Sequence, residues 1–254
     1  IVEGKVTEVE RVSFVGNLAY SDRRLRRVLA SKQAGLLRRL FRSDTFVAER
    51  LRFDKKLLKD FYYDRGFADF KINSTSAELS RDRGSYFMTF NIFEGKKYKF
   101  RNISINSEIP ELELKNLEPL LTIKSGKSYS PRIVDNELRK IENKILELNL
   151  DFVVVVPVIT KSIDNDYLDI NFIVKKGPPI YIQRIDVVGN TVTRDYVVRR
   201  QFKSVEGDPF NPSEIRNSAE RIRALGIFGN VKVLTRGADE KSAVIVDVKV
   251  EEQS

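Results

Sequence analysis

An internal repeat is the feature of this sequence that most restricts its fold. Residues 11–27 (RVSFVGNLAYSDRRLRR) and residues 184–200 (RIDVVGNTVTRDYVVRR) are identical at seven of seventeen aligned positions, whereas chance at ordinary residue frequencies would give roughly one. A more eroded copy of the same apolar run lies at residues 103–105. The copies therefore recur at about one third of the 254 residues. A repeat of this length indicates one structural unit that is present three times.

Each copy contains the same order of predicted elements. A strand-like apolar run ends at a Gly-Asn turn or its equivalent, a short helix and a longer amphipathic helix follow, and two strand-like runs complete the unit. The long helices are expected to end at residues that tolerate positive φ. The residues predicted at these turns and helix caps are Gly16, Asn17, Gly66, Asn149, Gly189, Asn190 and Gly226.

The start of the last long helix carries a clear local signal. Asn211 is a favoured N-cap residue, Pro212 suits the first helical position, and Glu214 is placed to complete a capping box. The middle copy has Ser130 and Pro131 at the matching positions. We therefore predict long helices that begin at residues 131 and 212.

These patterns predict an α+β protein of three tandem strand-helix-helix-strand-strand units. Each unit is expected to be a three-stranded mixed sheet covered by two helices. The predicted boundaries of the units are residues 1–97, 98–179 and 180–254. Residues 1–4 (IVEG) are similar to residues 92–95 (IFEG), so residues 1–5 are expected to be the tail of a preceding unit in a longer chain.

The chain has no cysteine and no histidine. This composition excludes disulfide bonds, thiolate nucleophiles and imidazole bases, and it removes the usual ligands of structural zinc. No pair of carboxylates invites acid and base roles, because residues such as Asp164 and Asp166 fall in a predicted turn. We therefore expect a protein that is not an enzyme and has no catalytic residue, cofactor or metal site.

The net charge of +9 favours acidic partners, nucleic acid or an anionic lipid surface. Residues 38–42 (RRLFR) are a candidate for contact with anionic lipid head groups. One interpretation is a basic nucleic-acid-binding repeat protein, for which steep loss of a tight complex with rising salt would be typical. The simpler interpretation is a solvated basic surface.

The strand that follows the long helices is predicted to lie at a sheet edge. Pro157 interrupts this strand in the middle unit, and a proline without an N–H group belongs at an edge or a bulge. An edge strand offers unpaired backbone groups to another extended chain, which can bind by strand addition. In the first unit the predicted docking edge consists of Phe70, Lys71, Ile72, Asn73, Ser74 and Thr75. The alternative is an inert edge that Lys71 and the polar residues protect.

The tandem units, the VGN turns and the segment FYYDRGFADFKINS (residues 61–74) resemble the POTRA domains of outer-membrane β-barrel assembly factors of Gram-negative bacteria. The resemblance covers essentially the whole chain, although the middle unit lacks the Gly-Asn turn and the Gly cap. It implies the third, fourth and fifth of five POTRA domains, followed by a membrane β-barrel. It also implies a location in the periplasm at the inner face of the outer membrane.

The resemblance further implies a scaffold that receives unfolded outer-membrane proteins and holds accessory assembly lipoproteins, with no nucleic acid as partner. Arg199 and Glu206 match positions that contact a partner lipoprotein, and Arg200 is the second arginine of the same helix. An arginine can bind a carboxylate through two parallel hydrogen bonds. The alternatives are a solvated helix face at this site and, for the whole chain, a related transporter or barrel-insertion factor with fewer such domains.

Overall fold

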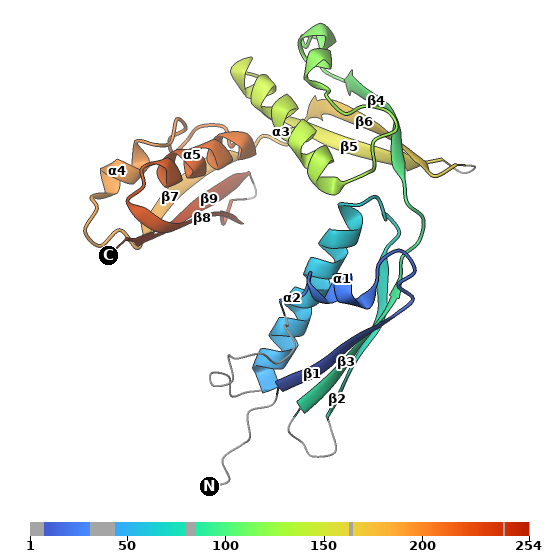
Figure 1. The fold of residues 1–254 in the computed structure, drawn as a ribbon. Coiled ribbons are helices and arrows are strands. Elements are labelled where there is room, and N and C mark those ends of the chain that lie inside the picture. The colour runs from blue at the N-terminus through green and yellow to red at the C-terminus, as the bar shows by residue number, and fades with distance from the viewer. Residues whose placement is uncertain (1–7, 31–43, 80–84, 163–164, 241, 254) are drawn as a thin grey trace. The chain divides into compact units, whose positions relative to one another are not determined.

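The computed structural model describes residues 8–30, 44–79, 85–162, 165–240 and 242–253 (Figure 1). The described residues form three separate three-stranded sheets with helices, which confirms the predicted α+β class. Residues 1–5 and the basic residues 38–42 lie outside the described parts. No helix in the described parts combines the length and the apolar character that a bilayer crossing requires.

The first sheet contains both pairing directions. Its middle strand runs parallel to the first strand and antiparallel to the strand that follows the helices, so the order is β1-β3-β2. Two helices lie on one face of this sheet (Figure 1). Between the layers Phe14 stacks on Phe90, and Tyr62 stacks on Phe70. The elements are β1 (Glu8–Val15), α1 (Asp22–Arg26), α2 (Asp44–Tyr63), β2 (Lys71–Leu79) and β3 (Ser85–Phe93).

The second sheet has the strand order β4-β6-β5 but lacks a first α-helix. Two short 3₁₀ turns replace the predicted helix in this unit. Pro119 explains the difference, because proline has no N–H group and disfavours the α conformation of the residue before it. The elements are β4 (Lys99–Ser107), η1 (Leu114–Asn116), η2 (Glu118–Leu120), α3 (Pro131–Glu147), β5 (Val153–Lys161) and β6 (Tyr167–Lys176).

The third sheet has the same arrangement of strands as the first sheet, with an irregularity of register at the matching position. Its order is β7-β9-β8, and the parallel pair has an irregularity between Ile182 and Arg184. The first sheet has the corresponding irregularity between Val9 and Arg11, at the position that the sequence repeat predicts. The elements are β7 (Tyr181–Val188), α4 (Asp195–Arg199), α5 (Pro212–Ala224), β8 (Phe228–Gly237) and β9 (Ala243–Glu252).

The α5 helix begins at Pro212, as predicted. Its N-cap residue Asn211 accepts hydrogen bonds from the N–H groups of Ser213 and Glu214, at 2.9 and 3.3 Å. Glu214 does not complete the predicted capping box, because its buried carboxylate accepts hydrogen bonds from the N–H of Lys203 and the guanidinium of Arg221. Lys203 before the helix and Arg221 two turns along it therefore replace the N–H of Asn211 as partners of this carboxylate.

The predicted turn glycines adopt left-handed backbone conformations. Gly16 and Gly189 both have φ of 92° directly after the first strand of their units. The predicted caps of the long helices also have positive φ, at 99° for Gly66, 54° for Asn149 and 70° for Gly226. Left-handed geometry ends a helix because the chain leaves the helical path while the last carbonyls still accept hydrogen bonds.

A carboxylate completes each Gly-Asn turn, a contact that the sequence analysis did not anticipate. Asn17 donates its side-chain amide to the carbonyl of Tyr20, and Asn190 does the same to Thr193. The N–H of Ala19 donates to Glu94 at 2.8 Å. At the equivalent position in the other copy, the N–H of Val192 donates to Glu252 at 3.0 Å. The sequence pattern does not predict this pairing, because the carboxylate lies 75 or 60 positions further along the chain, directly after β3 for Glu94 and at the end of β9 for Glu252.

By its contacts the chain divides into two compact units. One comprises residues 1–103, 123–134 and 159–170, and the other comprises residues 104–122, 135–158 and 171–254. This division passes through the strands of the second sheet. It therefore does not test the predicted boundaries after residues 97 and 179, which remain predictions.

Candidate functional site

The strand that follows the long helices lies at a sheet edge in all three sheets. β2, β5 and β8 each pair with one neighbour, so the edge position predicted from Pro157 is confirmed. One side of each strand therefore presents backbone N–H and C=O groups that no strand of its own sheet pairs. In β2 the predicted docking residues Lys71, Asn73 and Ser74 are exposed, and Ile72 and Thr75 are half-buried.

Phe70 does not belong to this edge, which corrects the prediction. It lies one residue before β2, and its ring is only 1% exposed and stacks on Tyr62 at a centroid distance of 4.1 Å. Its N–H donates to the carbonyl of Phe67, and its own carbonyl accepts from the Tyr63 hydroxyl. Phe70 is therefore a core residue whose backbone is already paired.

A bulge divides the predicted edge into two parts. The pairing of β2 with β3 shifts between Ile72 and Ser74, which leaves Asn73 without an opposite residue. Bulges bend a strand and disturb the ladder locally. From Ser74 to Leu79 the register with β3 is continuous. The regular part of the β2 edge, where another strand can add, therefore begins at Ser74.

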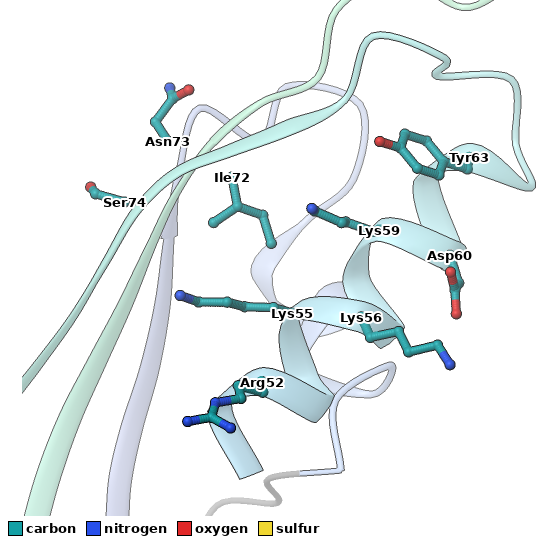
Figure 2. Close-up of a pocket in the computed structure, with 9 residues that line it drawn as sticks. All are labelled: Arg52, Lys55, Lys56, Lys59, Asp60, Tyr63, Ile72, Asn73 and Ser74. Atoms are coloured by element: carbon teal, nitrogen blue, oxygen red, sulfur yellow. The ribbon is translucent and has the colours of Figure 1, made fainter. Parts of the chain in front are cut away.

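A groove lies between α2 and the start of β2. Its volume is about 500 Å³. Figure 2 shows that Arg52, Lys55 and Lys59 extend from α2 toward β2, while Lys56 and Asp60 point away from the strand. The lining residues are Arg52, Lys55, Lys56, Lys59, Asp60, Tyr63, Ile72, Asn73 and Ser74. The groove therefore has a basic helical wall and a wall formed by an exposed strand edge.

Helical spacing explains why these cations share one wall. Residues three or four apart lie on the same side of a helix, so Arg52, Lys55 and Lys59 form a row along α2. Leu58 and Tyr62 on the neighbouring side are fully buried and anchor α2 on the sheet. Within the described parts of the chain, none of the three cations forms an ion pair. Sequence analysis missed this row, although its spacing was visible, because the side of α2 that faces β2 was not known.

The second predicted site brings Arg199 and Glu206 together. The Arg199 guanidinium donates to Glu206 at 3.2 Å, to Asp195 at 2.5 Å and to the carbonyl of Ile185 at 2.8 Å. Glu206 also accepts from the N–H of Ile185. Partial burial lowers the pKa of Arg199, but the hydrogen bonds to Asp195 and Glu206 outweigh it and raise this pKa above its ordinary value. Arg200, the third predicted residue, is exposed.

The family model described as POTRA, surface antigen variable number repeat, matches residues 7–95 and 180–253. The matched residues include the first and third sheets, which share the Gly-Asn turn. The middle copy, which lacks this turn, lies outside them.

Curated relatives include the outer membrane protein assembly factors BamA of Neisseria meningitidis serogroup B and of Neorickettsia risticii. Each is 30% identical to this chain, over 91% and 100% of it. The chain spans 29% and 34% of their lengths, about a third. A crystal structure of BamA POTRA3-5 from Haemophilus influenzae is similar, with a TM-score of 0.68, 21% identity and coverage of 97% of this chain and 96% of that one. At this identity the likeness supports the fold.

Proposed function

Because the chain belongs to the POTRA family, we propose that it is a non-enzymatic docking module of outer-membrane protein assembly, located in the periplasm at the inner face of the outer membrane. Two relatives that match over most of this chain are named as assembly factors for outer membrane proteins. On this proposal the partners are unfolded outer-membrane proteins and accessory lipoproteins. The module is a set of three domains, with boundaries after residues 97 and 179.

The open edge of β2 is the observation on which this proposal rests. An unfolded outer-membrane protein offers extended segments that differ in sequence, and main-chain hydrogen bonding recognises such segments without demanding particular side chains. The β2 edge has exposed backbone groups and the adjacent groove with a volume of about 500 Å³. We place the docking of client strands at residues 74–79, with Lys71, Ile72 and Asn73 at the entrance.

For the accessory lipoproteins we propose a contact at α4. Arg199 and Glu206, which hydrogen-bond to each other and to the backbone of Ile185, are proposed to form part of this contact surface. Arg200 is the exposed guanidinium beside them and is the group proposed to bind a partner carboxylate. Replacing Arg200 by Ala should weaken lipoprotein binding without affecting client-strand binding at β2.

The strand-docking proposal is tested with the 254-residue chain and short extended peptides. Nuclear magnetic resonance should show that an unmodified peptide shifts the amide signals of residues 74–79. A peptide methylated on every backbone nitrogen cannot donate main-chain hydrogen bonds, so its affinity should fall at least about tenfold. A peptide methylated on alternate nitrogens keeps one edge free and should still bind. Equal binding of all three peptides, or signal changes away from β2, would contradict the proposal.

A further inference from the structure

The row formed by Arg52, Lys55 and Lys59 lacks a negative counterpart in the described parts of the chain. All three side chains turn toward β2 (Figure 2), and Asp60, the only acidic residue in the groove lining, points away. Like charges four residues apart on a helix repel each other, so Lys55 and Lys59 disfavour the helix slightly when nothing binds between them and the strand. An anionic occupant of the groove would remove this repulsion.

From this arrangement we propose that the groove selects extended peptide segments with carboxylates on alternate residues, placed so that the acidic face turns toward α2. The inference rests on the proposed function, since it assumes that a client strand adds to β2. It goes further by naming the side chains that the site prefers. Strand addition alone would accept segments of any charge.

The spacing of the lysines along α2 matches the spacing of alternate side chains along a docked peptide strand. A helix rises about 1.5 Å per residue, so Lys55 and Lys59 lie about 6 Å apart along α2. Side chains on one face of a strand repeat every second residue, or about 6.7 Å. Two carboxylates at positions i and i+2 of a docked strand therefore come opposite these two lysines, and the side chain between them faces the other way.

The shape of the site favours a peptide over a nucleic acid or a lipid surface. The cations face a groove whose other wall is a strand edge, and Ile72 contributes an apolar side chain to it. Lys56 and Asp60 on the outward side carry opposite charges, so that side of α2 presents no uniform positive field. A backbone edge pairs with polypeptide backbone, whereas neither a phosphate chain nor a membrane surface supplies matching N–H groups.

The test compares three extended peptides that differ only at alternate positions, which carry Glu, Gln or Lys. Binding to the 254-residue chain is measured by fluorescence anisotropy at low salt. The Glu peptide should bind roughly tenfold more tightly than the Gln peptide, a difference typical of a few exposed ion pairs. This preference should shrink at high salt because exposed charges are screened. The Lys peptide should bind more weakly than the Gln peptide.

Charge reversal on α2 provides the matched variants. Lys59→Glu should reduce or abolish the preference for the Glu peptide and improve binding of the Lys peptide. Lys56→Glu changes the net charge equally on the same helix. The Lys56 side chain belongs to the groove lining but points away from β2, where the peptide docks, so the preference should persist. Circular dichroism verifies that both variants remain folded. Equal effects of the two substitutions would overturn the proposal, because they would show a response to overall charge.

The remaining outcomes separate this inference from the proposed function. If the Gln and Glu peptides bind equally at residues 74–79, the acidic selectivity is wrong while strand docking stands. If no peptide binds, both proposals fail. Vesicles that contain phosphatidylglycerol and a single-stranded DNA oligonucleotide serve as competing anions. Tighter binding of either than of the Glu peptide, lost in Lys59→Glu and kept in Lys56→Glu, would assign the groove to that anion.

Discussion

Gly16 and Gly189 show why the repeated turn requires glycine. Both have φ of 92°, a conformation that side chains with a Cβ atom rarely adopt. Space is a second constraint, since a Cβ atom at Gly189 would lie 2.0 Å from the carbonyl oxygen of Val250, and one at Gly16 would lie 2.1 Å from that of Ile92. The backbone of the central strand thus approaches each turn too closely for any other residue.

Gly189→Ala and Gly207→Ala separate the two constraints. Gly207 has φ of 95°, but a Cβ atom there would meet nothing within 4 Å. Gly207→Ala should therefore lower the free energy of unfolding by about 1–2 kcal/mol, the cost of left-handed geometry. Gly189→Ala adds the clash and should cost about 3 kcal/mol or more. Urea unfolding followed by signals of the third sheet measures both, and equal losses would show that the close contact relaxes freely.

Glu252 makes the turn of the third sheet sensitive to pH. Hydrogen bonds from the N–H of Thr193 and the hydroxyl of Thr191 lower the pKa of its carboxyl to about 2. A depressed pKa in the folded state means that the ionised carboxylate stabilises the fold above the pKa of the unfolded chain. That contribution is lost as the pH falls from about 4.3 through about 2.

Glu252→Gln should therefore lower the urea midpoint of the third sheet at pH 7, and the difference from the unsubstituted chain should shrink as the pH falls from 4.5 to 2. The measurement is a series of urea unfolding curves across this range. Glu240→Gln, in the turn before β9, removes the same charge without removing these hydrogen bonds. A constant difference at every pH would contradict the assigned role of Glu252.

At the start of helix α5, one of the two predicted capping contacts forms and the other does not. Asn211 caps the helix as the sequence predicts, because an N-cap needs only neighbouring backbone N–H groups. Glu214 instead meets Arg221 and Lys203, since burial beside them satisfies its carboxylate more fully than one local N–H. The two 3₁₀ turns of the second sheet are a similar case, where Pro119 overrode the helix that the repeat predicted.

Asn211→Ala should destabilise α5 by about 1 kcal/mol, because the N–H groups of Ser213 and Glu214 lose their acceptor. Asn211→Ser keeps a capping oxygen and should cost much less. Hydrogen exchange of the amides in the first turn of α5 reports the local effect, and urea unfolding reports the total. Similar losses in both variants would mean that the side chain acts through packing and not through capping.

Each of the first and third sheets has a hydrophobic core built from its own residues. The first core uses residues between Val12 and Ile92, and the third uses residues between Ile182 and Val250. A domain needs a core of its own to fold alone. These two cores support the proposed boundaries after residues 97 and 179.

Residues 180–254 on their own should therefore fold. The expected result is a circular dichroism spectrum with helix and strand, a cooperative thermal transition, and amide signals at the positions that they have in the 254-residue chain. A fragment of equal length that is displaced across the proposed boundary, residues 140–214, lacks the strands β8 and β9 and should not fold cooperatively. A disordered spectrum for residues 180–254 would reject the boundary.

The repeat and Pro157 together were enough to predict three sheets, their edge strands, and the glycines at the turns. These features depend on local patterns, namely periodicity, turn chemistry and a missing N–H group. Each of these patterns involves only residues that are close together in the sequence. The burial and the contacts of individual polar and aromatic side chains could not be predicted from these local patterns. Phe70 was predicted at an open edge and is buried. The hydrogen bonds of Arg199 to Glu206 and to the carbonyl of Ile185 were not predicted, and its contact with a partner stays a prediction.

Only the tertiary structure decided which distant groups meet. Glu94 reaches the N–H of Ala19 across 75 positions of the chain, and the α2 cations face β2 because the helix packs on the sheet at one particular rotation. Such contacts follow from the packing of whole layers, in which burial of apolar side chains such as Leu58 and Tyr62 sets the orientation of the helix. The polar residues beside them are then carried to positions that no local pattern specifies.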